Sequence, residues 1–180
     1  MKFTIKHEGK EINATLPDSW NDLTVKQFIA LNDKLTPLER LSSLSNTNLS
    51  FIENTGTDLQ PAIDYLNSVF SKVPPDLKKI KKGNIIFNGK TIKPPKNLNF
   101  TKFGQKSMIK NLINSDRTLQ SMVAEVFAIY VQPILDGKFD SKRIDAITKE
   151  VLKMKITEVF SWVVFFFHQL KKLKFHLQSS

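Results

Sequence analysis

Hydrophobic and polar residues alternate through the N-terminal stretch KFTIKHEGKEINATL. This period of two, interrupted at Glu8-Gly9, predicts a β-hairpin with strands near Lys2 to Lys6 and Glu11 to Leu16. Pro17 has no backbone N–H to add to a ladder, so the second strand is expected to end there. The chain therefore begins with a short antiparallel pair of strands.

After the predicted hairpin, the apolar residues have the spacing of a helix. In VKQFIALNDKL the apolar residues recur at intervals of three and four behind Thr24, which predicts a helix capped by Thr24, with Asp22 favouring its positive end. Two short helical pieces are expected in PLERLSSLS and NLSFIENT. A longer helix is expected over LQPAIDYLNSVF, with Thr57 or Asp58 as its cap and Pro61 tolerated in its first turn.

A linker is predicted in SKVPPDLKKIKKG, because Pro74-Pro75 cannot continue a helix and the lysines favour solvent. The next stretch, NIIFNGKTIKP, predicts a second hairpin, since Asn88-Gly89 suits a type I′ turn with two positive φ angles. Four further helices are expected, over Thr101 to Asn114, Leu119 to Leu135, Ser141 to Lys153 and Thr157 to Leu177.

The two predicted hairpin units share residues at equivalent places. Gly9, Lys10 and Ile12 recur 80 positions later as Gly89, Lys90 and Ile92, and Pro17, Asn21 and Gln27 recur 78 positions later as Pro95, Asn99 and Gln105. Short matches also arise by coincidence. Their equivalent placement in two supersecondary units favours pseudo-repetition.

The predicted fold class is α+β, mostly α-helical, with two pseudo-repeated units that each consist of a β-hairpin followed by a helical bundle. The units are expected at residues 1–73 and 84–180, joined by a basic linker at 74–83. Neither unit can bury much surface alone, so we expect them to pack as one compact body.

The composition is that of a folded protein, with 41% hydrophobic and 10% aromatic residues. The absence of cysteine excludes disulfides and thiolate chemistry and suits an intracellular origin. The longest strongly apolar run, VFSWVVFFF, has nine residues, whereas a spanning helix needs about 20. With no secretory signal at the N-terminus, we expect a cytoplasmic protein without a transmembrane segment.

The formal charge of +10 arises in one segment. Ten of the 27 basic residues are lysines between Leu77 and Ser115, where no Asp or Glu occurs, and the other 17 balance the 17 acidic residues. This segment is interpreted as a solvated basic face for an acidic protein partner or as a phosphate-binding patch. It lacks arginine, and its aromatics, Phe87, Phe100 and Phe103, are expected in strand and helix cores, so protein contact is favoured over nucleic acid. The candidate basic contact patch consists of Lys78, Lys79, Lys81, Lys82, Lys90, Lys93 and Lys96.

No catalytic signature is present. The chain lacks HExxH, GxSxG, GxxxxGK[ST] and GxGxxG motifs. His7, His168 and His176 have no neighbouring residues at metal-ligand spacing, and the carboxylates are explained by capping and solvation. We expect no enzymatic activity, no catalytic or metal-ligating residue and no cofactor.

The last predicted helix, in ITEVFSWVVFFFHQLKKLKFHL, is apolar over most of its circumference. The first interpretation is a central core helix. The alternative leaves Trp162, Phe165 and Phe166 as a partner interface, marked by an exposed aromatic cluster. Docking on a membrane surface through these aromatics and KKLK is a third interpretation.

Four segments carry a resemblance to a known group of proteins: LPDSWNDLTVKQFIAL, FNGKTIKPPKNLNFTKFGQ, YVQPILDGKFDSKRI and TEVFSWVVFFFHQLKKL. Together they resemble small proteins encoded in the morphogenesis regions of tailed bacteriophages of Bacteroidetes-type hosts. The resemblance implies a tail assembly chaperone, acting near the tape measure protein, or a minor virion protein. It supplies no functional residues.

The leading hypothesis is therefore a non-enzymatic phage morphogenesis protein, tail assembly chaperone-like, acting by protein–protein contact in the host cytoplasm. Its expected partners are other phage proteins of the tail or connector, or further copies of itself. One alternative is a virion structural subunit in a connector or tail ring. Another is an accessory protein that binds nucleic acid nonspecifically through the lysines.

Overall fold

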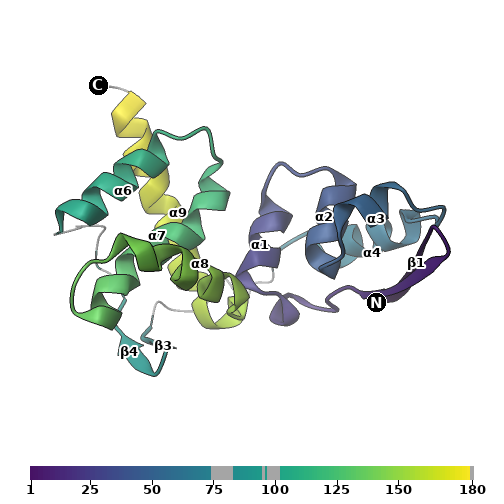
Figure 1. The fold of residues 1–180 in the computed structure, drawn as a ribbon, viewed down its shortest axis with the longest axis horizontal. Helices are drawn as coiled ribbons and strands as arrows, with labels where there is room; N and C mark the ends of the chain where they lie inside the picture. Colours follow the sequence, from purple (N-terminus) through teal and green to yellow (C-terminus); the bar gives the residue numbers. More distant parts are fainter. Residues whose placement is uncertain (74–82, 95, 97–101, 179–180) are drawn as a thin grey trace. The chain divides into compact units, whose positions relative to one another are not determined.

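A computed structural model describes residues 1–73, 83–94, 96 and 102–178. The chain divides into two units, which we call the first unit (Met1–Lys78 with Lys155–Thr157) and the second unit (Lys79–Met154 with Glu158–Ser180). The division at Lys78 falls within the expected linker, of which residues 74–82 lie outside the described part. Figure 1 shows the order of the elements along the chain.

The first unit opens with the antiparallel hairpin of β1 (Lys2–His7) and β2 (Lys10–Thr15). Its two-residue turn has φ of 47° at Glu8 and 74° at Gly9. Ile5, opposite Ile12, is fully buried, while Thr4, Lys6 and their partners on β2 lie on the opposite, polar face. The predicted hairpin is confirmed, and along each strand every second side chain points toward the same, inward face.

The predicted helices of the first unit are confirmed. They follow a short 3-10 turn, η1 (Trp20–Asp22), and comprise α1 (Val25–Asn32), α2 (Pro37–Ser45), α3 (Leu49–Glu53) and α4 (Gln60–Phe70). Thr24 and Gln27 form a capping box on α1, and Thr36 and Glu39 form one on α2. Each box satisfies two backbone groups that have no partner inside the helix.

The predicted caps of α4, Thr57 or Asp58, lie two residues and one residue before the observed N-cap. The N-cap position is Leu59, whose side chain cannot accept a hydrogen bond. The Asp58 carboxylate still accepts from the Gln60 N–H at 3.0 Å, whereas the Thr57 hydroxyl accepts from the backbone of Lys6 in β1 at 3.1 Å. The Thr57 hydroxyl thus bonds a residue that is distant in the chain. The pattern of neighbouring residues does not predict such a contact.

Lys155–Thr157 belong to the first unit through backbone contacts. The Ile156 N–H donates to the Leu23 carbonyl at 2.9 Å, and Thr24 forms an antiparallel bridge with Lys155. Leu23 and Ile156 are both fully buried.

The second unit begins with β3 (Ile85–Phe87) and β4 (Lys90–Ile92), which pair in antiparallel register. Asn88 has φ of 48° and Gly89 has φ of 72°. Both central residues are left-handed, so the predicted type I′ turn is confirmed.

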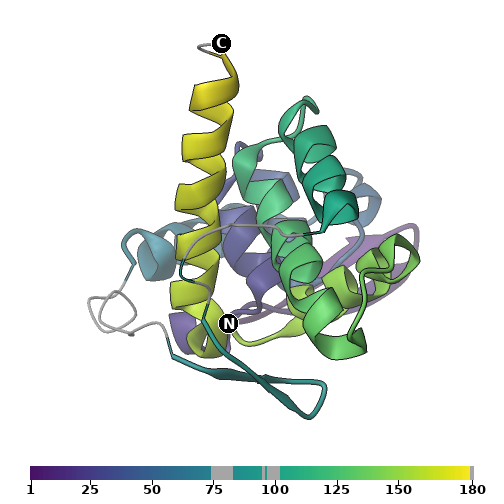
Figure 2. The same ribbon diagram turned by 90° about the vertical axis from the view of Figure 1, so that its left-hand side faces the viewer.

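The second unit also contains α6 (Phe103–Ile113), α7 (Leu119–Asp136), the 3-10 turn η2 (Ser141–Arg143) and α8 (Ile144–Lys153). The last helix, α9 (Ile156–Gln178), belongs to this unit from Glu158 onward. The expected helix from Ser141 to Lys153 is therefore a 3-10 turn followed by α8. Figure 2 shows α9 as a long, continuous helix with the β3–β4 hairpin near its N-terminal part.

An aromatic cluster forms the centre of the second unit. The Phe127 ring in α7 lies 5.3 Å from the rings of both Trp162 and Phe166 and 6.4 Å from that of Phe87, measured between centroids. All four side chains are buried. The fold is thus α+β, mostly helical, with two small antiparallel sheets in the described part of the chain.

Candidate functional site

The structure places the described members of the predicted basic patch on the surface. Lys90, Lys93 and Lys96 are exposed, whereas Lys78, Lys79, Lys81 and Lys82 lie outside the described residues. The Lys90 ammonium donates to the Leu135 carbonyl in the last turn of α7. A cation at a helix C-terminus stabilises the unpaired carbonyls and the negative end of the dipole, so Lys90 has a structural role.

A row of three lysines follows the exposed side of α6. Lys102, Lys106 and Lys110 are all exposed, while Gln105, Ile109 and Leu112 face the core. Residues four apart lie on one helix face about 6 Å from each other along the axis. We call these three residues the α6 lysine row. These lysines belong to the basic segment predicted from the sequence but not to the predicted contact patch, although their spacing of four indicates a shared face.

Phe103, in the first turn of α6, is 86% exposed. The expectation that it belongs to a helix core is therefore wrong, whereas Phe87 is buried as expected and Phe100 lies outside the described residues. Phe103 shares a face with Lys106 and Lys110, being three and seven residues away from them. The α6 lysine row thus carries an exposed aromatic ring beside it.

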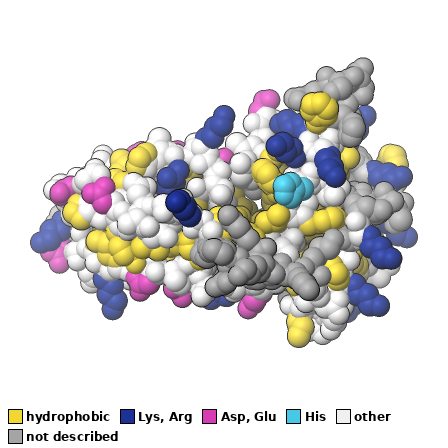
Figure 3. Space-filling view, turned by 180° about the vertical axis from the view of Figure 1, so that it is seen from behind, with side chains coloured by type: hydrophobic (Ala, Val, Ile, Leu, Met, Phe, Trp, Pro, Cys, Tyr) yellow, Lys and Arg dark blue, Asp and Glu magenta, His cyan; other side chains and the backbone are white. Residues whose placement is uncertain are grey.

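The charge excess lies in the second unit, which contains nine of the ten lysines of the basic segment. That unit holds 18 of the 27 basic residues but 7 of the 17 acidic ones, so the first unit is close to neutral. Arg117 and Arg143 are paired with Glu125 and Asp136, at 2.6 and 2.5 Å. Within the described part, no ion pair involves the α6 lysine row. Figure 3 shows lysine and arginine side chains standing singly or in small groups on the face drawn.

The aromatic residues considered for a partner interface are mostly core residues. Trp162 and Phe166 are 0% exposed, and the Trp162 indole donates to the Gly83 carbonyl at 2.8 Å. As folded, neither side chain presents a surface to a partner, which corrects the interface interpretation at these two positions. Phe165 is half-buried with its ring 5.5 Å from that of Phe166. Trp162 and Phe166 are buried because α9 packs against α7 and the β3–β4 hairpin, which cover this helix on several sides.

No catalytic arrangement stands out among the described residues. They contain no group of three or more His, Cys, Asp or Glu side chains placed to hold a metal ion. His7 bonds the Asn54 carbonyl at 2.8 Å through Nδ1 and packs edge-on against Phe51, and His168 is exposed on α9. A surface hollow on the first hairpin contains no imidazole or carboxylate; its lining residues are Lys2, Phe3, Thr4, Asn13, Ala14 and Thr15.

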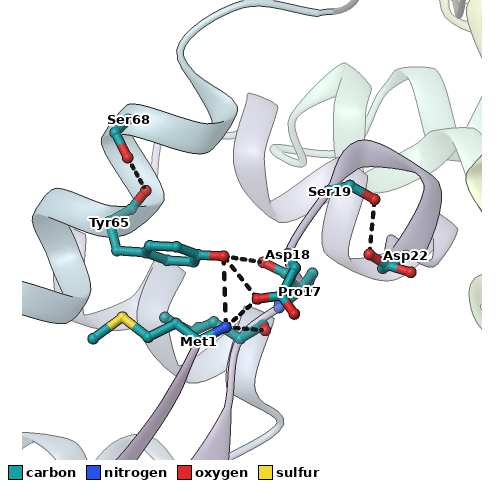
Figure 4. Close-up of polar contacts among 8 residues, drawn as sticks. Met1, Pro17, Asp18, Ser19, Asp22, Tyr65 and Ser68 are labelled. Atoms are coloured by element: carbon teal, nitrogen blue, oxygen red, sulfur yellow. Dashed lines mark hydrogen bonds and ion pairs between the residues drawn. The ribbon is translucent and has the colours of Figure 1, made fainter.

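A polar cluster ties the hairpin to α4 in the first unit (Figure 4). The Tyr65 hydroxyl donates to the Asp18 carboxylate at 2.8 Å, and the Met1 ammonium also contacts this carboxylate. The hydrogen bond from Met1 and then that from Tyr65 lower the pKa of Asp18 below its ordinary value. The same bond to Asp18 raises the pKa of the Tyr65 hydroxyl. These contacts join the N-terminus and the segment after β2 to α4.

Comparison with protein-family models, with curated proteins and with solved structures gave no match for this chain. Among the helices of the described residues, none combines the length and the apolar character needed to cross a bilayer. The α6 lysine row with Phe103 is thus the most distinctive exposed feature for which a binding role can be argued from the residues themselves.

Proposed function

We propose that this protein is a non-enzymatic morphogenesis protein of a tailed bacteriophage, acting by protein–protein contact in the manner of a tail assembly chaperone. The observation that supports protein–protein contact is the exposed α6 lysine row. It has no acidic partner among the described residues, and it lies on a unit with a large excess of positive charge. Such a surface attracts an acidic segment of a partner and orients it. The phage context comes from the sequence resemblance.

Trp162 and Phe166 of α9 have no part in this proposal, because both side chains are buried. Partner contact is instead assigned to the α6 lysine row and to Phe103, whose exposed ring offers apolar area beside the charges. A tail or connector protein with an acidic and partly apolar segment is the expected partner.

The test of the contact surface is a titration of a labelled acidic peptide with the full chain and two charge-reversal variants. One variant carries K102E, K106E and K110E. Its matched control carries K26E, K34E and K72E, three exposed lysines of the first unit, and so has the same net charge. We expect the first variant to lose binding and the control to retain most of it. Equal losses would mean that net charge, and not this surface, causes binding.

The phage role is tested by following the protein during infection with the phage that carries it. A tail assembly chaperone should associate with a tail component before assembly is complete and be missing from purified particles. Stoichiometric presence in mature particles, measured by mass spectrometry, would support the virion subunit alternative and overturn the chaperone proposal.

A second candidate function is nonspecific binding of single-stranded nucleic acid. The exposure of Phe103 favours it, since an exposed ring beside cations is the arrangement that stacks on a base while lysines contact phosphates. Titration of a single strand across salt concentrations, with Phe103→Leu as the variant, separates the two functions. Strong loss on Phe103→Leu with single strands, but not with the acidic peptide, would favour nucleic acid.

We also propose that the two units are pseudo-repeats. Gln27 and Gln105, which matched in the sequence comparison, are each the third residue of a helix that follows a hairpin. Both side chains are buried, and each amide donates to a carbonyl of the next described helix, that of Leu44 at 2.7 Å and that of Ile129 at 2.9 Å. This shared role supports a common design beyond the matching letters.

A further inference from the structure

The strand β2 is an edge strand whose outer side is open. In the described part of the chain its only strand partner is β1. The outer side of β1 is occupied, since the Lys6 N–H donates to the Thr57 hydroxyl at 3.1 Å and the Thr55 hydroxyl donates to the Lys6 carbonyl at 2.8 Å. Among the described residues, the outer side of β1 is therefore bonded by its own chain at Lys6, and no such bond reaches the outer side of β2.

The backbone groups that point outward from β2 follow from the hairpin's register. In an antiparallel pair, alternate residues exchange hydrogen bonds with the opposite strand and the others point away from it. Lys6 points away from β2, so its cross-strand partner Glu11 points away from β1, as do Asn13 and Thr15 at intervals of two. No described residue bonds to the outward N–H and C=O groups of these three. Such a row pairs readily with another strand.

We propose that β2 pairs antiparallel with the β2 strand of a second copy of this chain, with Asn13 opposite the Asn13 of that copy. In this register Glu11 lies opposite Thr15, and all three outward-pointing residues join the new ladder, which supplies about six hydrogen bonds. The result is a four-stranded sheet in the order β1-β2-β2-β1. This inference concerns the first unit and is independent of the function proposed for the second.

The side chains of the polar face fit a second copy. Asn13 accepts from the Thr4 hydroxyl at 3.0 Å through Oδ1, which leaves its NH₂ group to meet the other Asn13 across the two-fold axis. Glu11 already pairs with Lys6 at 2.9 Å and faces the neutral Thr15 of the second copy. A shift that places Glu11 opposite Glu11 sets like charges against each other, which destabilises a sheet. The chain thus favours the Asn13-centred register.

The opposite face also fits. Ile12 is half-buried beside the fully buried Ile5, and in the proposed register it lies opposite Ala14 of the second copy, which in turn pairs with Phe3. The apolar row of one hairpin therefore continues into the other. Pairing removes further apolar surface of Ile12 and Phe3 from water, in addition to forming the ladder.

Sedimentation velocity of the full chain, from about 1 μM to about 1 mM, tests the proposal over the range expected of a small interface. We expect a concentration-dependent dimer. Asn13→Pro removes an outward N–H that β1 does not use, a position at which edge strands tolerate proline, and it should abolish the dimer. Asn13→Thr keeps the N–H and should still dimerise. A chain that remains monomeric at about 1 mM, or an Asn13→Pro variant that dimerises normally, would overturn the proposal.

Two variants at position 15 test the register even if Asn13→Pro fails to fold. Thr15 lies opposite Lys2 in its own hairpin and opposite Glu11 of the second copy in the proposed dimer. Thr15→Glu should raise monomer stability and weaken the dimer, whereas Thr15→Lys should do the reverse. Because each dimer contains two such pairs, we expect the dissociation constant to change by roughly 2- to 30-fold in each direction. Changes of the same sign in both variants, or no change, would contradict the register.

Discussion

The side-chain amide of Gln105 donates to the backbone carbonyl of Ile129 in the middle of α7, at 2.9 Å. This carbonyl would normally accept from the residue four positions later, but that residue is Pro133, which has no N–H. The Gln105 side chain therefore supplies the donor that the proline removes. Gln105 and Pro133, 28 residues apart, therefore act together, since the glutamine side chain replaces the hydrogen bond that the proline cannot donate.

Replacing Gln105 by Leu should lower the free energy of unfolding by about 1 to 3 kcal/mol, because the buried Ile129 carbonyl loses its donor. Pro133→Ala restores a backbone N–H at the position that normally bonds this carbonyl. In the Pro133→Ala background the loss caused by Gln105→Leu should therefore be clearly smaller. Urea unfolding of the unchanged chain, the two single variants and the double variant gives the coupling energy. Strictly additive effects would contradict the compensation of Pro133 by Gln105.

Gly104 should not tolerate alanine, although alanine normally stabilises a helix. A Cβ at this position would lie 2.5 Å from Cδ1 and Cε1 of the Phe139 ring. We expect Gly104→Ala to lower stability by about 1 kcal/mol, since displacing the ring outweighs the gain in helix propensity. Thermal unfolding measures this effect. Ser107→Ala, at an exposed position of the same helix, should be neutral or stabilising, and Phe139→Leu should relieve the defect.

The turn of the second hairpin should depend on the left-handed conformation of Gly89, at φ 72°. Gly89→Val should lower the free energy of unfolding by about 1 to 2 kcal/mol, since a β-branched residue is strained in this region. A Cβ at Gly89 meets no other atom within 4 Å, so the loss comes from the backbone alone. Gly89→Asn should lose less. Denaturant midpoints that are unchanged in both variants would argue against a type I′ turn.

Phe166→Ala should lower stability by roughly 3 to 5 kcal/mol, because it leaves a cavity in the fully buried aromatic cluster. Phe165→Ala, one residue earlier on α9, provides the matched control and should have a clearly smaller effect, since Phe165 is half-buried. Chemical denaturation of both variants measures the two losses in the free energy of unfolding. If the two losses were equal, the assignment of Phe166 to the core would have to be revised.

Asp18 should make the stability of the protein depend on pH in the acidic range. Because contacts with Met1 and Tyr65 lower the pKa of this carboxyl in the folded state, its stabilising contribution is present above about pH 4 and is lost as the pH falls through the lowered value. Asp18→Asn should therefore unfold at a lower temperature than the unchanged chain at pH 7, with a difference that shrinks below about pH 4. Tyr65→Phe should show a weaker form of the same dependence. A difference that stays constant down to about pH 2 would contradict this account.

Much of the local structure follows from the sequence alone. Alternation and turn residues locate both hairpins, and Asn88-Gly89 specifies the turn type because few residues adopt two successive positive φ angles. Thr24 locates the start of α1, since a helix cap is formed by neighbours in the chain. The residues of the α6 lysine row were also visible in the sequence as charge, and their spacing of four indicates a shared face, although the predicted contact patch did not include them.

Only the tertiary structure decided which aromatic residues are exposed and how distant polar groups pair. Trp162 and Phe103 are both aromatic residues within predicted helices. Packing against α7 and the hairpin buries Trp162, whereas Phe103 remains at the surface. The bond from Gln105 to Ile129 and the open edge of β2 likewise depend on which segments meet across many residues. Periodicity along a chain specifies the faces of each element, but the neighbour that covers a face is chosen by packing of the whole fold.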